Sequence, residues 1–186
     1  MKRFLVLLLL LVSGCTVGKD AAQPGAGDFY LVAPGGQVKI RYAAADRKSL
    51  TGLEGESLME DGKTVRLADY SGKPVVINIW GAWCGPCRTE APEMQKIFDA
   101  GTQVVGVDVK ETAKSHPQDF MKDRSLTYPS IYDASARSFI NVFKGLPANV
   151  VPSTFVVDKD HKVAAVFLEP VLAPDVQTVL DELAKE

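Results

Sequence analysis

From residue 74 onward, apolar positions form short continuous runs that predict strands buried on both faces of a sheet. Two such runs, both rich in β-branched residues, are PVVINIW at 74–80 and QVVGVDV at 103–109. Two more, PSTFVVD at 152–158 and KVAAVFLE at 162–169, are joined by the turn sequence DKDH. This short connection predicts that the last two strands lie side by side.

Other segments space their apolar residues as amphipathic helices do. In the first of them, Met94, Ile97 and Phe98 mark one predicted face. Two shorter helices fall between the strand at 103–109 and the strand at 152–158, where they predict a helical insert. The predicted helices cover residues 84–100, 117–125, 134–143 and 173–186.

Ahead of these elements, two turn sequences predict β-hairpins. The hairpin at 29–42 would fold around Pro-Gly-Gly, and a second is centred on Asp61–Gly62, with Leu58 before it and Val65 after it. The order of elements predicts one α/β domain over 43–186, with a mixed sheet and helices on both faces. Whether the first hairpin packs on that domain or belongs to a tether stays open.

The first residues have the pattern of an export signal. Met1–Arg3 is basic, and Phe4–Val12 is an unbroken apolar run of nine residues. A membrane-spanning helix needs about 20 such residues, so the run fits the apolar core of a secretory signal. Ser13–Gly14 is a poor match to the A-x-A-like site of ordinary signal cleavage.

The stretch Val12–Cys15 instead resembles a bacterial lipobox, in which the chain is cut before the cysteine and a diacylglycerol is attached to its sulfur. The resemblance implies a lipoprotein signal peptide at 1–14 and a lipidated Cys15. Residues 15–42 would then be a lipid-anchored tether, flexible where it is rich in Gly, Pro and Ala, followed by the short hairpin. The alternative is a soluble secreted protein in which Cys15 has no role.

Composition and charge exclude one class of partner. Of 186 residues, 46% are hydrophobic and 24% are charged, which is ordinary for a globular protein. The formal net charge is −2. Without residues 1–14, which include Lys2 and Arg3, 19 basic residues face 23 acidic ones, a net charge of −4. Because no cluster of Lys and Arg stands out, nucleic-acid binding is not expected.

After the N-terminal cysteine is assigned to a lipid, Cys84 and Cys87 remain, three positions apart. Structural disulfides of secreted proteins usually close longer loops. Zinc takes about four Cys or His ligands, whereas the two histidines, His116 and His161, are expected in solvated loops. Covalent haem attachment needs a histidine directly after the second cysteine, where the chain has Arg88. No metal or haem is expected.

Thiol–disulfide exchange fits the surroundings of the cysteine pair. The predicted strand ends at Trp80 and the predicted helix begins near Cys84, and a helix N-terminus favours a thiolate. Pro86 suits the first helical turn. Cys84 is then the exposed attacking thiol, and Cys87, facing inward, resolves the mixed disulfide. A peroxidatic cysteine would be expected behind Thr or Ser, where the chain has Gly81.

The motifs around this pair resemble those of thioredoxins. Trp83–Cys87 (WCGPC) matches their active site, Pro92 stands where they kink the following helix, and Val151–Thr154 (VPST) resembles their cis-proline loop. The resemblance spans residues 50–186 and implies a thioredoxin-like α/β fold. This fold has a mixed central sheet flanked by helices, here with an N-terminal β-hairpin extension and a central helical insert.

The lipobox, the insert and Glu90 make the sequence similar to one branch of that family. This branch comprises the extracytoplasmic thioredoxin-like proteins of cytochrome c maturation (ResA/TlpA/CcmG type), and the layout is similar to actinobacterial members in particular. Thioredoxins carry a buried acid where this chain has Asn78, and the branch shares this replacement and has a glutamate where Glu90 stands. Glu90 is thus implied as a catalytic group that relays protons, the alternative being a solvated helix residue.

The resemblance also implies a substrate-binding surface around Cys84. Pro152 is expected in the cis form, the alternative being an ordinary trans proline, and the backbone of Val151 would pair with an extended substrate segment. Trp83 is expected at the rim of this surface. The dipeptide Gly85–Pro86 is that of thioredoxin, which leaves the redox potential open.

These features predict a membrane-anchored, extracytoplasmic thiol–disulfide oxidoreductase with a redox-active Cys84–Cys87 disulfide. By resemblance, it reduces disulfides of apocytochrome c or its maturation partners. We expect no cofactor and a monomeric protein. Its electrons would come from a membrane protein of the CcdA/DsbD type. The alternatives are an oxidase or isomerase for exported proteins, and a non-catalytic binding module on the same scaffold.

Overall fold

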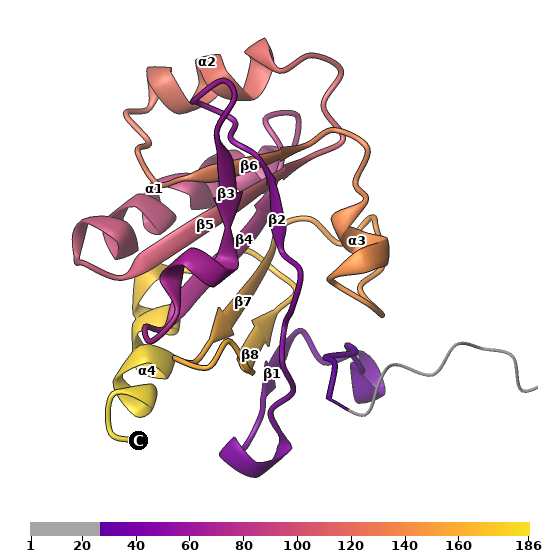
Figure 1. Cartoon of the computed structure of the whole chain (residues 1–186), viewed down its shortest axis with the longest axis vertical. Helices are drawn as coiled ribbons and strands as arrows, with labels where there is room; N and C mark the ends of the chain where they lie inside the picture. Colours follow the sequence, from indigo (N-terminus) through magenta and orange to yellow (C-terminus); the bar gives the residue numbers. More distant parts are fainter. Residues whose placement is uncertain (1–26) are drawn as a thin grey trace, which may run out of the picture.

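The computed structural model describes residues 27–186, in which helices and a hairpin cover the two faces of a central sheet (Figure 1). The signal peptide, Cys15 and most of the tether expected from the sequence lie outside the described residues. Within residues 27–186, no helix is both long enough and apolar enough to cross a membrane.

The central sheet has six strands. They are β1 (Lys39–Arg41), β4 (Val75–Trp80), β5 (Gln103–Val109), β6 (Ser130–Asp133), β7 (Ser153–Val157) and β8 (Val163–Phe167). Their spatial order is β1-β8-β7-β4-β5-β6. β4, β5 and β6 run parallel, and β7, β8 and β1 are each antiparallel to their neighbours. The sheet is therefore mixed, as predicted.

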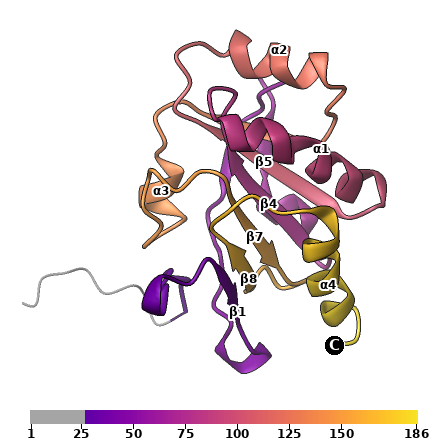
Figure 2. The ribbon, with the colours of Figure 1, turned by 180° about the vertical axis from the view of Figure 1, so that it is seen from behind.

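Two helices, α1 (Gly85–Asp99) and α4 (Ala173–Leu183), lie side by side on one face of the sheet (Figure 2). The buried residues of α2 (Ser115–Asp123) belong to the same core as theirs. The opposite face carries α3 (Ser138–Asn141) and the hairpin of β2 (Glu54–Glu56) and β3 (Thr64–Arg66), which share a second core (Figure 1). Short 3-10 helices are η1 (Pro34–Gly36), η2 (Ala44–Asp46) and η3 (Leu67–Tyr70).

The central position of β4 explains its continuous apolar run. All six residues of β4 are buried, because helices cover one face and the hairpin covers the other. Val76 and Trp80 belong to the core beneath the helices, whereas Ile77 and Ile79 belong to the core beneath the hairpin. Since side chains alternate along a strand, Asn78 points to the same face as Val76 and Trp80, toward α1.

The prediction of a hairpin at 29–42 is wrong. The Pro-Gly-Gly sequence forms η1, and β1 pairs with β8 instead of with the residues before the turn. Phe29 is buried, with its ring edge-on to those of Tyr42 and Phe155. Burial of apolar side chains against the sheet outweighs the local turn preference here. The described part of this segment therefore packs on the α/β domain and is not a tether.

Most other predicted elements are confirmed, with two differences. The hairpin around Asp61–Gly62 forms between β2 and β3. The helix predicted at 134–143 is a single turn, Ser138–Asn141. The edge strand Ser130–Asp133 has no counterpart in the sequence analysis, because four residues directly after a proline carry too little periodicity to indicate a strand.

Candidate active site

Cys84 and Cys87 form a disulfide at the N-terminus of α1, with their Cα atoms 5.3 Å apart. As predicted, Cys84 occupies the helix N-cap, and Pro86 lies in the first turn. The Cys84 Sγ accepts a hydrogen bond from the Cys87 backbone N–H at 3.3 Å. This N–H group and the helix dipole both favour negative charge on Cys84 after reduction.

Cys84 is predicted from the sequence to be exposed, but only 4% of the residue is exposed in the disulfide form. Its Sγ lies 3.7 Å from the carbonyl oxygen of Val151, in the loop that precedes β7. Cys87 lies in the first turn of α1 and its side chain is buried, which agrees with its predicted inward position. Of the two cysteines, Cys84 is therefore the more accessible to a partner sulfur, and it lies beside Val151.

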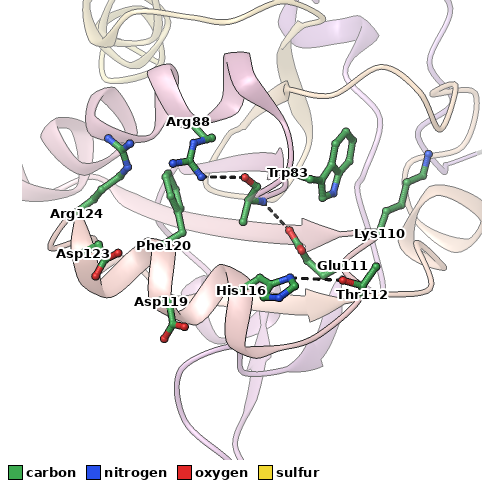
Figure 3. Close-up of a pocket in the computed structure, with 11 residues that line it drawn as sticks. Trp83, Arg88, Lys110, Glu111, Thr112, His116, Asp119, Phe120, Asp123 and Arg124 are labelled. Atoms are coloured by element: carbon green, nitrogen blue, oxygen red, sulfur yellow. Dashed lines mark hydrogen bonds between the residues drawn. The ribbon is translucent and has the colours of Figure 1, made fainter.

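The segment Gly81–Cys84, called the redox loop below, is held by hydrogen bonds to three neighbouring groups, and Figure 3 draws the bonds to Glu111 and Arg88. The Ala82 N–H donates to Glu111 Oε1 at 2.6 Å, and Arg88 Nη1 donates to the Ala82 carbonyl at 3.2 Å. The Trp83 indole N–H donates to the Val109 carbonyl at 2.9 Å. The end of β5 and the first turn of α1 thus fix the backbone that carries Cys84.

Trp83 lies at the rim, as predicted, and is 52% exposed. Its ring folds back over Gly81, where a Cβ atom would lie 2.5 Å from the indole nitrogen. Only glycine leaves room for this ring position, because no side-chain carbon is tolerated at that distance. Gly81 thereby allows Trp83 to form a flat apolar wall beside Cys84.

A cleft of about 940 Å³ lies between the redox loop and α2 (Figure 3). Phe120 forms part of its wall, and the guanidinium groups of Arg88 and Arg124 stack on this ring at 4.9 and 4.8 Å from its centroid. Acidic and basic side chains occur together around the cleft. Its lining comprises Ala82, Trp83, Arg88, Lys110, Glu111, Thr112, His116, Asp119, Phe120, Asp123 and Arg124.

Behind the cysteines, a buried polar cluster joins four parts of the fold. Asn78 of β4 donates to Glu90 Oε2 of α1 at 2.8 Å and to Thr154 Oγ1 of β7 at 3.0 Å. The other oxygen of Glu90 accepts the backbone N–H of Val171 at 2.8 Å. Glu90 is only 2% exposed, so it is not the solvated helix residue of the alternative interpretation.

Burial dominates the acid–base behaviour of Glu90. Loss of solvation raises its pKa from the ordinary value to about 7, although the hydrogen bonds from Val171 and Asn78 act in the opposite direction. Glu90 follows Cys87 by three positions on α1, and both are buried, so they lie on the same face of the helix. A carboxyl group that titrates near neutral pH thus lies one helical turn from the inner cysteine.

The loop before β7 has the predicted cis peptide bond between Val151 and Pro152. Pro152 is buried, while Val151 is partly exposed and adjoins Cys84. The Val151 N–H meets no acceptor among residues 27–186. Trp83, Val151 and Pro152, which the sequence analysis names from separate segments, are therefore brought together around Cys84.

Two acidic residues near the redox loop were missed by the sequence analysis. Asp108 is fully buried near the end of β5, and Glu111 holds the Ala82 N–H. A signal for Asp108 was present, since a charged residue interrupts the apolar run QVVGVDV. Glu111 looks like an ordinary loop residue, and only the return of the chain to Ala82 shows its contact.

The histidines do not contribute to a metal centre. Within the described residues, no group of three or more His, Cys, Asp or Glu side chains is arranged to hold a metal ion. His116 is exposed in the cleft, with its Nδ1 3.5 Å from Thr112 Oγ1. His161 is partly buried, because the turn between β7 and β8 packs against the segment at Leu50, whose N–H it binds through its carbonyl.

Residues 47–166 match the AhpC/TSA family, which covers more than half of the chain. The chain belongs to the AhpC/TSA family. This AhpC/TSA-family protein is also 30% identical over 129 residues to the thiol-disulfide oxidoreductase ResA of Bacillus cereus, covering 66% of this chain and 72% of that protein. With ResA of Bacillus subtilis it shares 33% identity over 115 residues, 59% of this chain and 62% of that protein.

Solved structures of bacterial proteins resemble this AhpC/TSA-family protein over most of their length. A secreted thiol-disulfide isomerase from Corynebacterium glutamicum superposes with a TM-score of 0.82 and 40% identity, covering 86% of this chain and 99% of that one. A DsbF homologue from Corynebacterium diphtheriae gives a TM-score of 0.79 and 43% identity, covering 84% and 99%. These similarities confirm the thioredoxin-like fold.

The relatives and the cysteine pair together establish the type of chemistry. The protein is a thiol–disulfide oxidoreductase with Cys84 and Cys87 as its dithiol–disulfide pair. Its substrates are protein thiols and disulfides. A non-catalytic binding module has no support among these relatives.

Proposed function

We propose that this oxidoreductase is exported, is held at the outer face of the cell membrane by a lipid on Cys15, and reduces disulfides of apocytochrome c or of its maturation partners. The observation that carries the reductive mechanism is the buried carboxyl of Glu90, which titrates near neutral pH one turn from Cys87. The lipobox-like residues 12–15 and the similarity to a secreted relative support the proposed location.

The first step of the proposed reaction is attack by Cys84. Its thiolate, stabilised by the Cys87 N–H and the α1 N-terminus, attacks one sulfur of a substrate disulfide. A bond forms between Cys84 and that sulfur, and the other substrate sulfur leaves as a thiolate. The substrate disulfide is thereby replaced by a mixed disulfide with the protein.

The second step releases the substrate and uses Glu90. Ionised Glu90 accepts the proton of the Cys87 thiol, and the resulting thiolate attacks Cys84 Sγ. The Cys84–Cys87 disulfide forms, and the second substrate sulfur leaves as a thiolate that takes up a proton. Two electrons have then passed from the dithiol to the substrate, which leaves the protein in the disulfide form that the structure contains.

Substrate binding in this proposal uses the surface around Cys84. The Val151 N–H has no acceptor among the described residues. A backbone carbonyl of an extended segment beside the substrate cysteine would accept a hydrogen bond from it, as in strand addition. Pro152 shapes this loop, and the exposed ring of Trp83 offers apolar contact on the other side of Cys84. Recognition through the backbone suits an unfolded substrate such as an apoprotein.

The cycle needs electrons from outside the protein. Each turnover leaves a disulfide at Cys84–Cys87, and a dithiol partner has to reduce it before the next round. For a protein anchored at the outer face, we propose a membrane thiol-transfer protein of the CcdA/DsbD type as this donor. The exchange with the donor uses the same sulfur of Cys84, so donor and substrate bind in turn.

A trapping experiment tests the proposed function. In Cys87→Ser, the mixed disulfide on Cys84 cannot resolve, so the substrate stays attached and can be identified by mass spectrometry. Cys84→Ser/Cys87→Ser is the matched control that forms no adduct. We expect apocytochrome c or a cytochrome c maturation protein in the adduct. Recovery of only unrelated exported proteins would count against this substrate.

A second candidate function follows from one relative, the isomerase from C. glutamicum. A protein with the same residues could instead form or rearrange disulfides in exported proteins. The reduction potential separates these functions, because it is about −270 mV for thioredoxin and about −120 mV for the oxidant DsbA. Equilibration of the Cys84–Cys87 pair with glutathione measures this reduction potential. A value near about −120 mV would support the oxidase.

A further inference from the structure

Two arginines in the cleft beside the redox loop carry charge that no ion pair balances. Arg88 of α1 and Arg124, directly after α2, stack on Phe120 at 4.9 and 4.8 Å from its ring centroid. Phe120 is buried, so its ring holds both guanidinium groups at one part of the cleft wall. Both arginines are exposed, and among residues 27–186 neither forms an ion pair with a carboxylate. Two cations gathered in this way, called the arginine pair below, attract an anion.

The acidic residues of the cleft do not neutralise the arginine pair. Glu111 is directed at the redox loop, where its Oε1 accepts the Ala82 N–H at 2.6 Å. The side chain of Asp119 points away from both guanidinium groups (Figure 3). Asp123 precedes Arg124 in the chain but forms no ion pair with a described residue. A carboxylate brought by a partner would therefore meet guanidinium groups that no carboxylate of this chain holds.

Arg88 connects the arginine pair to the reacting sulfur. It follows Cys84 by four positions, which is about one helical turn or about 6 Å along α1. Its Nη1 donates to the Ala82 carbonyl at 3.2 Å, and a guanidinium has five N–H donors, so donors remain for a carboxylate. Ala82 and Trp83 both line the cleft. A group bound there lies against the residue that precedes Cys84, at a fixed place relative to the disulfide.

The size of the cleft and the chemistry of the protein select the occupant. Its volume of about 940 Å³ is that of a site for a whole small molecule, so it has room for several residues of a peptide. Because the substrates are protein thiols and disulfides, the chain beside the reacting cysteine is the segment that reaches the cleft. Carboxylates pair with guanidinium groups through short, charge-assisted hydrogen bonds.

We propose that the arginine pair binds an acidic side chain of the partner protein, close in sequence to the partner's reacting cysteine. An extended segment advances about 3.3 Å per residue, which places this Asp or Glu about two to four residues from that cysteine. Arg88 and Arg124 are then specificity-determining residues, and an acidic segment is preferred over a neutral or basic one.

This inference goes beyond the proposed function and does not depend on it. It needs a dithiol that reacts with protein thiols and disulfides, and it holds for either direction of electron flow and for any exported substrate. The trapping experiment on Cys87→Ser can therefore fail while the preference for acidic segments remains.

Peptide substrates test the preference directly. Each peptide carries the same disulfide between two cysteines, flanked on both sides by Glu, by Gln or by Lys. The second-order rate constant for oxidation of the reduced protein is measured at pH 7 by acid quenching and chromatography. We expect the Glu peptide to react about tenfold faster than the Gln peptide, about threefold for each guanidinium, and the Lys peptide to be slowest. The advantage should shrink in about 0.5 M salt, because both arginines are exposed.

Variants assign this preference to the arginine pair. Arg124→Gln should lower the ratio of the Glu-peptide to the Gln-peptide rate constant about threefold, and Arg88→Gln/Arg124→Gln should bring the ratio close to one. Because Arg88 also holds Ala82, each variant is judged by its own ratio, in which a change in cysteine reactivity cancels. Lys122→Gln is the matched control, since Lys122 lies on α2, is exposed and does not line the cleft. Its ratio should equal that of the wild type.

Two outcomes would overturn the proposal. One is equal rate constants for the Glu and Gln peptides with the wild type. The other is an equal fall of the ratio in Lys122→Gln and Arg124→Gln, which would show a long-range effect of net charge and not a site.

A binding measurement keeps the proposal testable if the double variant does not fold. In Cys84→Ser/Cys87→Ser, which cannot react, the Nε–H NMR signals of Arg88 and Arg124 should shift when the Glu peptide is added and stay in place with the Gln peptide. Unchanged arginine signals at concentrations of the Glu peptide that shift the Trp83 indole signal would refute the site.

Discussion

Asn78 donates its side-chain amide to Glu90 at 2.8 Å, and this contact joins the central strand to the helix that carries the cysteines. The same amide donates to Thr154, which lies two residues after Pro152. Glu90 is thereby held between the redox pair and the cis-proline loop. The finding gives Asn78 a role in orienting Glu90, in a position where the sequence analysis notes only that an acid is absent.

Replacement of Glu90 by glutamine should remove proton transfer at Cys87, while its single amide oxygen keeps one of the two hydrogen bonds that Glu90 accepts from Val171 and Asn78. In the wild type, the rate of mixed-disulfide resolution should rise with pH through the Glu90 pKa of about 7. In Glu90→Gln this dependence should disappear, with a rate about 100-fold lower at pH 7.5. Rapid-quench kinetics with a disulfide peptide measures both.

Glu93→Gln is the matched control for this variant. Glu93 lies on the same helix, but its hydrogen bond to Lys96 is the main reason why its pKa is lowered, so it is ionised at all pH values of interest. Its replacement should leave the pH profile unchanged. A profile in Glu90→Gln that matches the wild type would show that another group receives the proton.

Glu90 also predicts a pH dependence of stability. Its pKa is about 7 in the folded protein and near 4.5 when unfolded, so the folded state holds the extra proton between these values. This contribution to stability is fully present below pH 4.5 and is lost as the pH rises toward 7. Urea unfolding measures this change. Between pH 4.5 and pH 8, the free energy of unfolding of Glu90→Gln should increase by about 3 kcal/mol relative to that of the wild type. A constant difference would contradict the buried, titrating carboxyl.

A methyl group at Gly81 should displace Trp83. The Cβ atom of Gly81→Ala would lie 2.5 Å from the indole nitrogen, so the ring has to leave its hydrogen bond to Val109. We expect a more solvent-exposed tryptophan emission spectrum and a loss of stability of about 1 to 3 kcal/mol. Gly85→Ala is the steric control, since its Cβ meets nothing within 4 Å. Equal stability of the two variants would contradict the packing of Trp83 over Gly81.

The N-terminal segment should contribute to folding through Phe29. Because its ring is buried against Tyr42 and Phe155, Phe29→Ala should lower the free energy of unfolding by about 3 to 5 kcal/mol. The neighbouring Tyr30 is 50% exposed. Tyr30→Ala should therefore change the free energy of unfolding by less than about 1 kcal/mol. Denaturant unfolding compares them, and similar values for both would mean that the segment is not part of the core.

The proposed anchor has its own test, independent of the redox site. Cys15→Ser removes the sulfur that would carry the diacylglycerol, so the protein should move from the membrane fraction to the soluble extracytoplasmic fraction. Its dithiol activity in solution should be unchanged. Equal membrane association of the variant and the wild type would refute lipidation at Cys15.

Much of the fold follows from short-range patterns in the sequence. The apolar runs at 74–80 and 103–109 predict buried strands because helices and the hairpin cover both of their faces. Cys84 and Pro86 indicate the start of α1, since capping and missing donors are local properties. The hairpin prediction at 29–42 fails for the opposite reason, because a local turn signal competes there with burial against a distant strand.

The candidate site divides in the same way. The motif WCGPC and the sequence VPST determine the chemistry and the residues of the redox centre, because these need particular atoms at fixed spacing. The tertiary structure alone decides that Glu90 is buried against Asn78, and that Glu111 reaches back to Ala82. Both contacts join residues from separate elements, and the acid–base properties of these carboxyl groups depend on a loss of solvent that only packing produces.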